Sequence, residues 1–206
     1  MLRLIRALGL KRAGPPIIVV SGLPRSGTSM MMSMLNAAEL ELVTDRIREA
    51  DTDNPKGYYE DERVKELEKT RDKSWLSECR GKVVKIISFL LKDLPDAHRY
   101  KIIFMQRSLQ EVIASQNKML TRRGEPVDPA DDDRMVELYR DHLRKVELTL
   151  AQKRNLEHID VPYGDAVANP RQQAARVAEF LGLDLDVDKM ARSVDPALYR
   201  NRRKSG

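Results

Sequence analysis

The chain has 206 residues, of which 41% are hydrophobic and 33% are charged, with 37 lysines and arginines against 32 acidic residues. This length and composition indicate one soluble globular domain with a sizeable core. The positive charge suits an anionic ligand, nucleic acid or an anionic membrane surface, but basic and aromatic residues are not interleaved as in proteins that bind single-stranded nucleic acid. A single cysteine, Cys79, excludes a disulfide within the chain and a cysteine metal cluster, and it favours a reducing, cytoplasmic setting.

Both ends of the chain are basic. Residues 1–16 are expected to form an arm, residues 17–200 a single domain, and residues 201–206 a tail. Residues 1–14 are too short to span a membrane, and Arg3 and Arg6 interrupt their apolar positions, so they do not form a signal-peptide core. They leave open a weak peripheral membrane contact, although a frayed helix packed on the domain is favoured.

The first predicted unit is a strand, a short loop and a helix. Residues 17–20 are four consecutive β-branched residues, typical of a strand buried on both faces. Gly22 and Gly27 enclose a tight loop, and residues 27–38 are expected to form a helix. Such an arrangement directs loop N–H groups and the positive end of a helix dipole at an anion. The alternative is a turn in which the glycines only permit positive φ.

The spacing of these glycines matches a nucleotide-binding Walker A loop, with one difference. The residue after the second glycine is Thr28 rather than lysine, and the cation lies inside the loop at Arg25. A kinase of this class uses that lysine on the β- and γ-phosphates of its nucleotide. The sequence therefore predicts phosphate binding without the expected kinase lysine.

Later segments alternate strands with helices. Strands are predicted at residues 41–44, 83–87, 101–105 and 159–161. Helices are predicted at residues 62–73, from residue 106 through Leu120, at 134–154, at 170–181 before a Gly182 cap, and once more before the tail. Asp131, Asp132 and Asp133 are expected at a helix start, where carboxylates suit the dipole, rather than on a metal. The predicted fold class is α/β, with a mainly parallel central sheet and flanking helices.

Residues 24–29, P-R-S-G-T-S, resemble the 5′-phosphosulfate-binding loop of sulfotransferases, typically P-K/R-S-G-T-T/S. The resemblance implies the P-loop NTPase-like sulfotransferase fold and 3′-phosphoadenosine 5′-phosphosulfate as the donor. It assigns donor binding to Arg25, Ser26, Gly27, Thr28 and Ser29. It also gives Arg25 a catalytic role, stabilising charge on the bridging oxygen as the sulfuryl group leaves.

Two further motifs extend the resemblance across residues 17–200. Arg107 follows a predicted strand and Ser115 comes eight residues later, a pairing that holds the 3′-phosphate in this family. The proline that often follows two residues after the arginine is replaced by Leu109. Tyr163, in a segment similar to the family's V-x-Y-E-D-L, is implied to line the nucleotide site, but the next residue is Gly164 rather than glutamate. A buried core tyrosine is the competing interpretation.

The general base is assigned to Glu60, which ends D-N-P-K-G-Y-Y-E, a segment similar to N-P-x-G-Y/F-x-E in bacterial members. Where the cytosolic branch has a K-T-H-L-P histidine base, this chain keeps the lysine as Lys85 but has an apolar residue at the histidine position. The alternative is that Glu60 caps a helix starting near Glu62, with Asp61 competing for either role.

Together these features predict a sulfotransferase that needs no metal, since a sulfuryl group carries less charge than a phosphoryl group. The implied acceptor bears a hydroxyl or an amine, and no nucleic-acid partner is expected. A P-loop kinase, a non-catalytic nucleotide-binding or nucleic-acid-binding module and a sulfotransferase that binds the donor without turnover stay open as alternatives.

Overall fold

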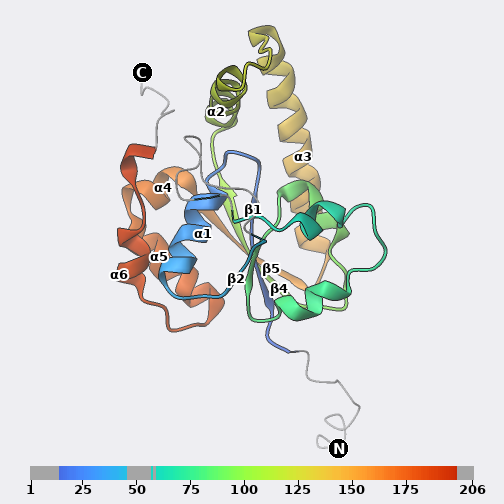
Figure 1. Ribbon diagram of the computed structural model, residues 1–206, viewed down its shortest axis with the longest axis vertical. Helices are drawn as coiled ribbons and strands as arrows, with labels where there is room; N and C mark the ends of the chain where they lie inside the picture. The colour runs from blue at the N-terminus through green and yellow to red at the C-terminus, as the bar shows by residue number, and fades with distance from the viewer. Residues whose placement is uncertain (1–13, 46–56, 58, 199–206) are drawn as a thin grey trace, which may run out of the picture.

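A computed structural model describes residues 14–45, 57 and 59–198 of the chain. Its centre is a five-stranded sheet in the order β2-β3-β1-β4-β5, and every neighbouring pair of strands is parallel (Figure 1). The strands are β1 (Ile17–Gly22), β2 (Leu42–Val43), β3 (Val83–Lys85), β4 (Tyr100–Gln106) and β5 (Leu156–Pro162). The predicted α/β class is confirmed.

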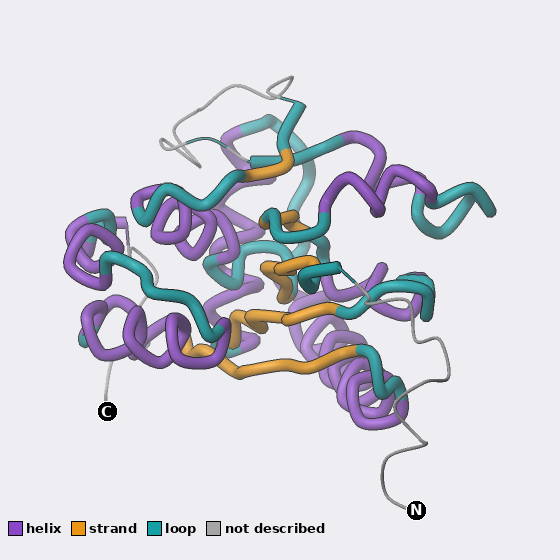
Figure 2. Tube along the Cα trace, turned by 90° about the horizontal axis from the view of Figure 1, so that it is seen from below, coloured by secondary structure: helices purple, strands orange, loops and turns teal. Residues whose placement is uncertain are grey.

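Helices cover both faces of the sheet, and Figure 2 shows the strands between two helical layers. The α-helices are α1 (Thr28–Ala37), α2 (Leu109–Arg122), α3 (Asp132–Gln152), α4 (Tyr163–Ala168), α5 (Pro170–Leu181) and α6 (Val187–Arg192). The 3₁₀ helices are η1 (Glu62–Glu66), η2 (Ser74–Cys79), η3 (Ser88–Asp93), η4 (Pro129–Asp131) and η5 (Pro196–Leu198).

Strand β1 is buried along its whole length because its alternate side chains enter two different cores. Ile18 and Val20 pack with residues of α1, α5 and α6. Ile17 and Val19 pack on the opposite face with residues of η1, η2, η3 and α3. The run of β-branched residues therefore has the two-sided burial that a central parallel strand requires.

Helices α2 and α3 pack against each other and rise above the sheet (Figure 1). A small apolar cluster joins Val112 and Ile113 of α2 to Tyr139 of α3 and to Leu23, which directly follows β1. The α2–α3 pair is thus packed against the loop that carries the predicted phosphate site. As expected, Asp132 and Asp133 lie in the first turn of α3.

The predicted helix over residues 62–73 is wrong. The structure has the 3₁₀ helix η1, followed by turns. The Thr70 side chain accepts a hydrogen bond from the Asp72 N–H at 3.3 Å, and the Asp72 carboxylate accepts one from the Ser74 N–H at 2.9 Å. Such local side-chain bonds compete with helical ones, and only Val64 and Leu67 of this segment enter the core.

Other boundaries agree with the sequence to within a few residues. Helix α5 covers the predicted range and ends at Gly182, whose φ of 68° closes the helix. Strand β3 ends at Lys85 rather than residue 87, and the short helix α4 was not predicted. Most of the predicted arm, 1–16, and the tail, 201–206, lie outside the described residues. Among the helices that the structure describes, none is long and apolar enough to cross a membrane.

Candidate functional site

The loop between β1 and α1 is held in a conformation that depends on two glycines. Gly22 has φ 147°, and a Cβ there would lie 2.7 Å from the carbonyl oxygen of Met105 on β4. Gly27 has φ 102°, and a Cβ there would overlap the ring of Tyr163. Within the described structure, no side chain caps α1 and its first turn carries no acidic residue. The first turn of α1 therefore contributes no carboxylate of its own to oppose an anion at the positive end of this described helix.

Arg25 joins the loop to β4 and α2. Its Nε donates a hydrogen bond to Ser115 Oγ at 3.1 Å, and its carbonyl oxygen accepts one from an Arg107 Nη at 3.0 Å. Its φ of 69° is left-handed, which is uncommon for a residue with a side chain. These bonds stabilise the unusual backbone, and they bring together three predicted donor-binding residues that are 82 and 90 positions apart.

Arg107 is surrounded by protein groups that fix its orientation. Its Nε donates to Glu111 Oε2 at 3.0 Å, and the two side chains are only 7% and 9% exposed. Its guanidinium carbon lies 4.5 Å from the centre of the Tyr163 ring. Glu111 was not predicted. It lies in the first turn of α2, four residues after Arg107, which precedes the helix, so the ion pair joins the end of β4 to the start of α2. The buried carboxylate offsets the charge of Arg107 and holds its guanidinium in place.

Tyr163 is buried, with 5% of its surface exposed, in the core on the α1 side of the sheet. This burial agrees with the competing interpretation of Tyr163 as a core tyrosine, and its predicted part in lining the nucleotide site stays a prediction. The same ring touches the loop at Gly27 and the guanidinium of Arg107, so it supports both halves of the predicted donor site.

Glu60 reaches the same edge of the sheet through Lys85, the last residue of β3. Lys85 Nζ lies 3.2 Å from Glu60 Oε1 and 3.3 Å from Ser29 Oγ in the first turn of α1. The Lys85 side chain is 8% exposed and that of Glu60 26%, so Glu60 is the more exposed partner of this ion pair. The predicted base is thus close to the predicted phosphate loop.

The competing interpretation of Glu60 as a helix cap is wrong. Asp61 caps η1 instead, because its Oδ1 accepts a hydrogen bond from the Arg63 N–H at 3.0 Å. Asp61 is 7% exposed, whereas the Glu60 carboxylate turns toward Lys85.

Ser26 and Thr28 are more enclosed than the motif suggests, with 1% and 8% of their surfaces exposed. The Ser26 N–H donates to the carbonyl of Leu23 at 3.1 Å, and its hydroxyl is buried with no hydrogen-bond partner among the described residues. That hydroxyl lies where a Cβ of Gly22 would be, so Ser26 packs against the back of the loop. Ser26, Gly22 and Gly27 therefore fix the shape of the loop by packing it tightly against β4 and Tyr163.

The three histidines do not form part of this cluster of predicted site residues. His98 lies just before β4, at the opposite end of the strand from Arg107, and its ring contacts Arg80 at 3.2 Å. His142 of α3 stacks on Phe89 and contacts the Ser88 hydroxyl at 2.9 Å. Burial lowers the pKa of both histidines. His158 is exposed on β5. These positions give the three histidines structural or surface roles, away from the phosphate loop.

A model of the sulfotransferase family matches residues 62–187, which is 126 of the 206 residues. The chain belongs to the sulfotransferase family. The matched range includes Arg107, Ser115 and Tyr163, whereas the phosphate loop and Glu60 precede it. No curated protein sequence matches this sulfotransferase.

Solved structures agree with this fold. The sulfotransferase domain of the Synechococcus PCC 7002 olefin synthase is 16% identical, with a TM-score of 0.51 over 95% of this chain and 91% of that one. A sulfotransferase domain from the curacin biosynthetic pathway is 15% identical, with a TM-score of 0.52 over 93% of each chain. At these identities the likeness supports the fold, and the residue roles must be argued from the site itself.

Proposed function

We propose that this sulfotransferase moves a sulfuryl group from 3′-phosphoadenosine 5′-phosphosulfate to a hydroxyl or amine acceptor. The observation that carries the proposal is the meeting of Arg25, Arg107 and Ser115 beside the first turn of α1. Two cationic side chains, a hydroxyl and a helix N-terminus suit a ligand with phosphate groups at two positions.

The order of the strands suggests how the donor would lie. Strand β1 and its loop are flanked by β4, which leads to Arg107 and Ser115, and by β3, which ends at Lys85. We assign the 3′-phosphate to the β4 side and the 5′-phosphosulfate to the loop residues 25–29. The sulfuryl end would then face β3, where Lys85 and Glu60 meet.

The roles of the chain's residues follow from this orientation. The first-turn N–H groups of α1 and the Arg25 guanidinium would stabilise the negative charge that develops on the bridging oxygen, a contribution of roughly 3–4 kcal/mol for one preorganised donor. Glu60 would accept the acceptor's proton, a role worth about 10²–10⁴ in rate. The acceptor atom bonds to sulfur as the bond from sulfur to the bridging oxygen breaks, and adenosine 3′,5′-bisphosphate leaves.

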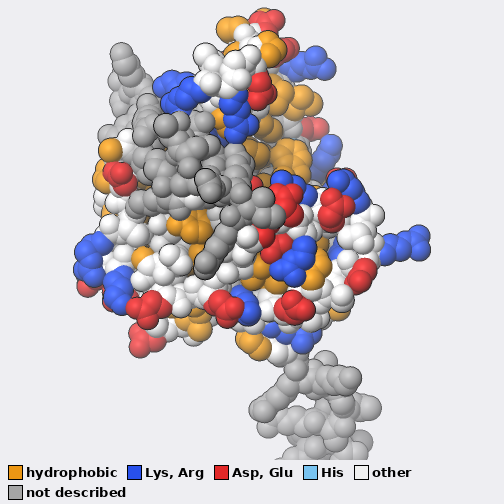
Figure 3. Space-filling view, viewed as in Figure 1, with side chains coloured by type: hydrophobic (Ala, Val, Ile, Leu, Met, Phe, Trp, Pro, Cys, Tyr) orange, Lys and Arg blue, Asp and Glu red, His pale blue; other side chains and the backbone are white. Residues whose placement is uncertain are grey.

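The described part of the face in Figure 3 favours a small anionic ligand over nucleic acid. Acidic and basic side chains lie interspersed over the face seen in Figure 3, so its described part does not gather the net charge of +5 into one basic surface. A cytoplasmic location is part of the proposal. It rests on the single cysteine, Cys79, which is buried as a free thiol. Burial raises the pKa of this thiol to about 11, so it stays protonated at neutral pH.

Turnover tests the proposal directly. The protein is incubated with the donor and a panel of alcohols, phenols and amines, and the release of adenosine 3′,5′-bisphosphate is measured. Arg25→Ala should abolish acceptor-dependent release, while Arg171→Ala should not, because Arg171 pairs with Asp188 on the surface of α5 and α6. Sulfation retained by Arg25→Ala would contradict the assignment of the loop.

A further inference from the structure

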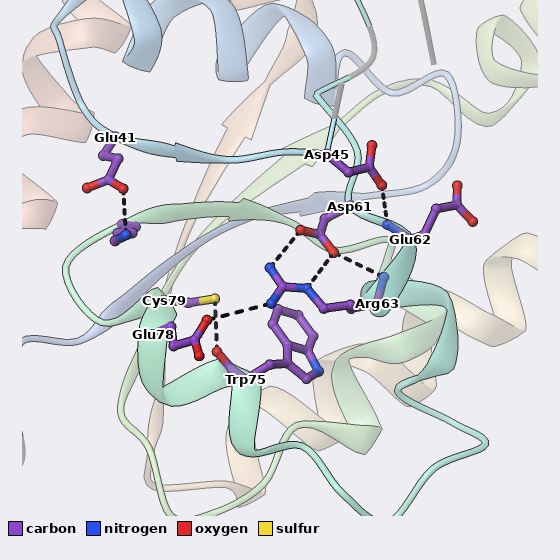
Figure 4. Close-up of polar contacts among 9 residues, drawn as sticks. Glu41, Asp45, Asp61, Glu62, Arg63, Trp75, Glu78 and Cys79 are labelled. Carbon is purple, nitrogen blue, oxygen red and sulfur yellow. Dashed lines mark hydrogen bonds and ion pairs between the residues drawn. The ribbon is translucent and has the colours of Figure 1, made fainter. Parts of the chain in front are cut away.

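Glu60 is held by its backbone as well as by its carboxylate. Asp45, two residues after β2, donates its N–H to the Glu60 carbonyl at 3.1 Å. One oxygen of the Asp45 carboxylate accepts a hydrogen bond from the Glu62 N–H at 2.7 Å (Figure 4). The two bonds lie on either side of residue 61, so Asp45 fixes the path of the chain as it leaves Glu60.

These bonds place the two ends of Glu60 relative to neighbouring strands. Leu42 and Val43 of β2 pair with Val83 and Val84 of β3. Asp45 extends from β2 to the Glu60 backbone, and Lys85 extends from β3 to the Glu60 carboxylate at 3.2 Å. The position of the carboxylate is therefore set by the rigid sheet through two routes.

A second set of contacts holds the chain just after Glu60. Asp61 Oδ1 and Oδ2 accept hydrogen bonds from Nε and an Nη of Arg63, each at 2.9 Å. The Arg63 guanidinium lies 4.7 Å from the centre of the Trp75 ring and 3.7 Å from the Glu78 carboxylate, which docks η1 on η2 (Figure 4). The residue before Glu60, Tyr59, has a left-handed φ of 51°, which persists only where surrounding contacts enforce it.

We propose that Asp45 is a positioning residue, whose carboxylate holds the 60–62 backbone so that Glu60 stays beside Lys85 and the phosphate loop. This inference rests on the proposed role of Glu60 as the base. The Asp45 carboxylate acts on that backbone through the Glu62 N–H, so an asparagine at 45 can keep the bond with its amide oxygen and an alanine cannot. The Asp61–Arg63–Trp75 cluster supports the same segment from the other side.

The first test needs no acceptor. Crystal structures of Asp45→Ala and Asp45→Asn would show whether Glu60 Oε1 stays within hydrogen-bond distance of Lys85 Nζ. We expect the contact to be lost or disordered in Asp45→Ala and kept in Asp45→Asn. A contact unchanged in both variants overturns the inference. If Asp45→Ala does not fold, Asp45→Ser takes its place, because the shorter serine side chain cannot reach the Glu62 N–H. We then expect the Glu60–Lys85 contact to be kept in Asp45→Asn and lost in Asp45→Ser, and a contact kept in both variants overturns the inference.

The second test is kinetic and uses a double-mutant cycle with Glu60→Gln. Asp45→Ala should lower kcat by roughly tenfold to a hundredfold, with the KM for the donor little changed, because a misplaced base slows the chemical step. Asp45→Asn should restore most of the rate. In the Glu60→Gln background Asp45→Ala should have no further effect. Asp188→Ala, which removes a surface carboxylate paired with Arg171, is the matched control and should turn over normally.

The two ways of failing are distinguishable. If Glu60→Gln turns over like the unmodified protein, the base assignment is wrong and the positioning role falls with it. If Glu60→Gln is inactive but Asp45→Ala has the same effect in both backgrounds, or none, the base assignment stands and the positioning role alone is overturned.

Discussion

At the scale of single residues, the site depends on close contacts that only certain side chains permit. Gly27 lies directly against the ring of Tyr163, which also contacts the guanidinium of Arg107. Arg107 in turn holds the carbonyl of Arg25. The loop, Arg25 and Arg107 are therefore packed together, and a substitution at one of them is expected to displace the others.

Gly27→Ala tests this packing. The left-handed backbone costs a side chain about 1 kcal/mol, and overlap with Tyr163 adds a few kcal/mol more. The free energy of unfolding, measured with urea, should fall by about 3 kcal/mol. Gly124→Ala is the matched control, since Gly124 has a φ of 71° but nothing within 4 Å of an added Cβ. Equal losses in the two variants would show that the contact with Tyr163 carries no energy.

Glu111→Ala tests the buried ion pair. Removing one partner of such a pair leaves a buried charge without its counter-ion and costs about 3 kcal/mol of unfolding free energy. If Arg107 binds the 3′-phosphate, that anion can replace the lost carboxylate. Adenosine 3′,5′-bisphosphate should then raise the melting temperature of Glu111→Ala more than that of the unmodified protein. Equal shifts would indicate that the ligand phosphate does not reach Arg107.

At the scale of elements, short segments held by side chains position the predicted base. The 3₁₀ helices η1 and η2 are joined by Asp61, Arg63 and Trp75 rather than by a long run of backbone hydrogen bonds. The hydrogen bonds from Arg63 lower the pKa of the Asp61 carboxyl below its ordinary value. This part of the structure should therefore respond to acid.

The sign of that response follows from the lowered pKa of Asp61. A carboxyl whose pKa is lower in the folded state stabilises the fold above its unfolded pKa, near pH 4, and loses that contribution as the pH falls through the folded pKa. Asp61→Asn should reduce the loss of unfolding free energy below about pH 4, and it should be less stable than the unmodified protein at pH 7. Guanidinium titrations at several pH values measure both effects. Identical acid dependence in the two proteins would contradict the contribution of Asp61.

The sequence predicts best those helices and strands whose own residues carry a clear signal, either a run of apolar residues or a glycine at the helix end. Strands β1 and β4 contain runs of apolar residues in a sheet covered on both faces, and α5 ends at Gly182, whose left-handed backbone caps the helix. The 62–73 segment was mispredicted because polar side chains such as Thr70 and Asp72 bond the backbone locally. Helix propensity does not include the energy of such local side-chain hydrogen bonds.

At the scale of the whole molecule, the site is assembled by the order of the strands. Parallel strands β3, β1 and β4 lie side by side, so Lys85, the phosphate loop and Arg107 emerge at one edge although they are far apart in sequence. Motif matching could name Arg25, Glu60, Arg107 and Ser115. It could not give all the partners that fix them. Glu111 is close to Arg107 in sequence but belongs to no motif, and Asp45 reaches the Glu60 segment only through the fold.

Isothermal titration calorimetry with adenosine 3′,5′-bisphosphate, beside AMP and ATP with Mg²⁺, tests the central claim most directly. The account predicts that the bisphosphate binds without divalent metal and at least tenfold more tightly than AMP, and that Arg107→Ala removes this preference. The preference arises because only the bisphosphate places a phosphate near Arg107 and Ser115. Equal affinity for AMP and the bisphosphate would contradict the donor assignment. Binding of ATP with Mg²⁺ but not of the bisphosphate would contradict it as well and would favour a kinase.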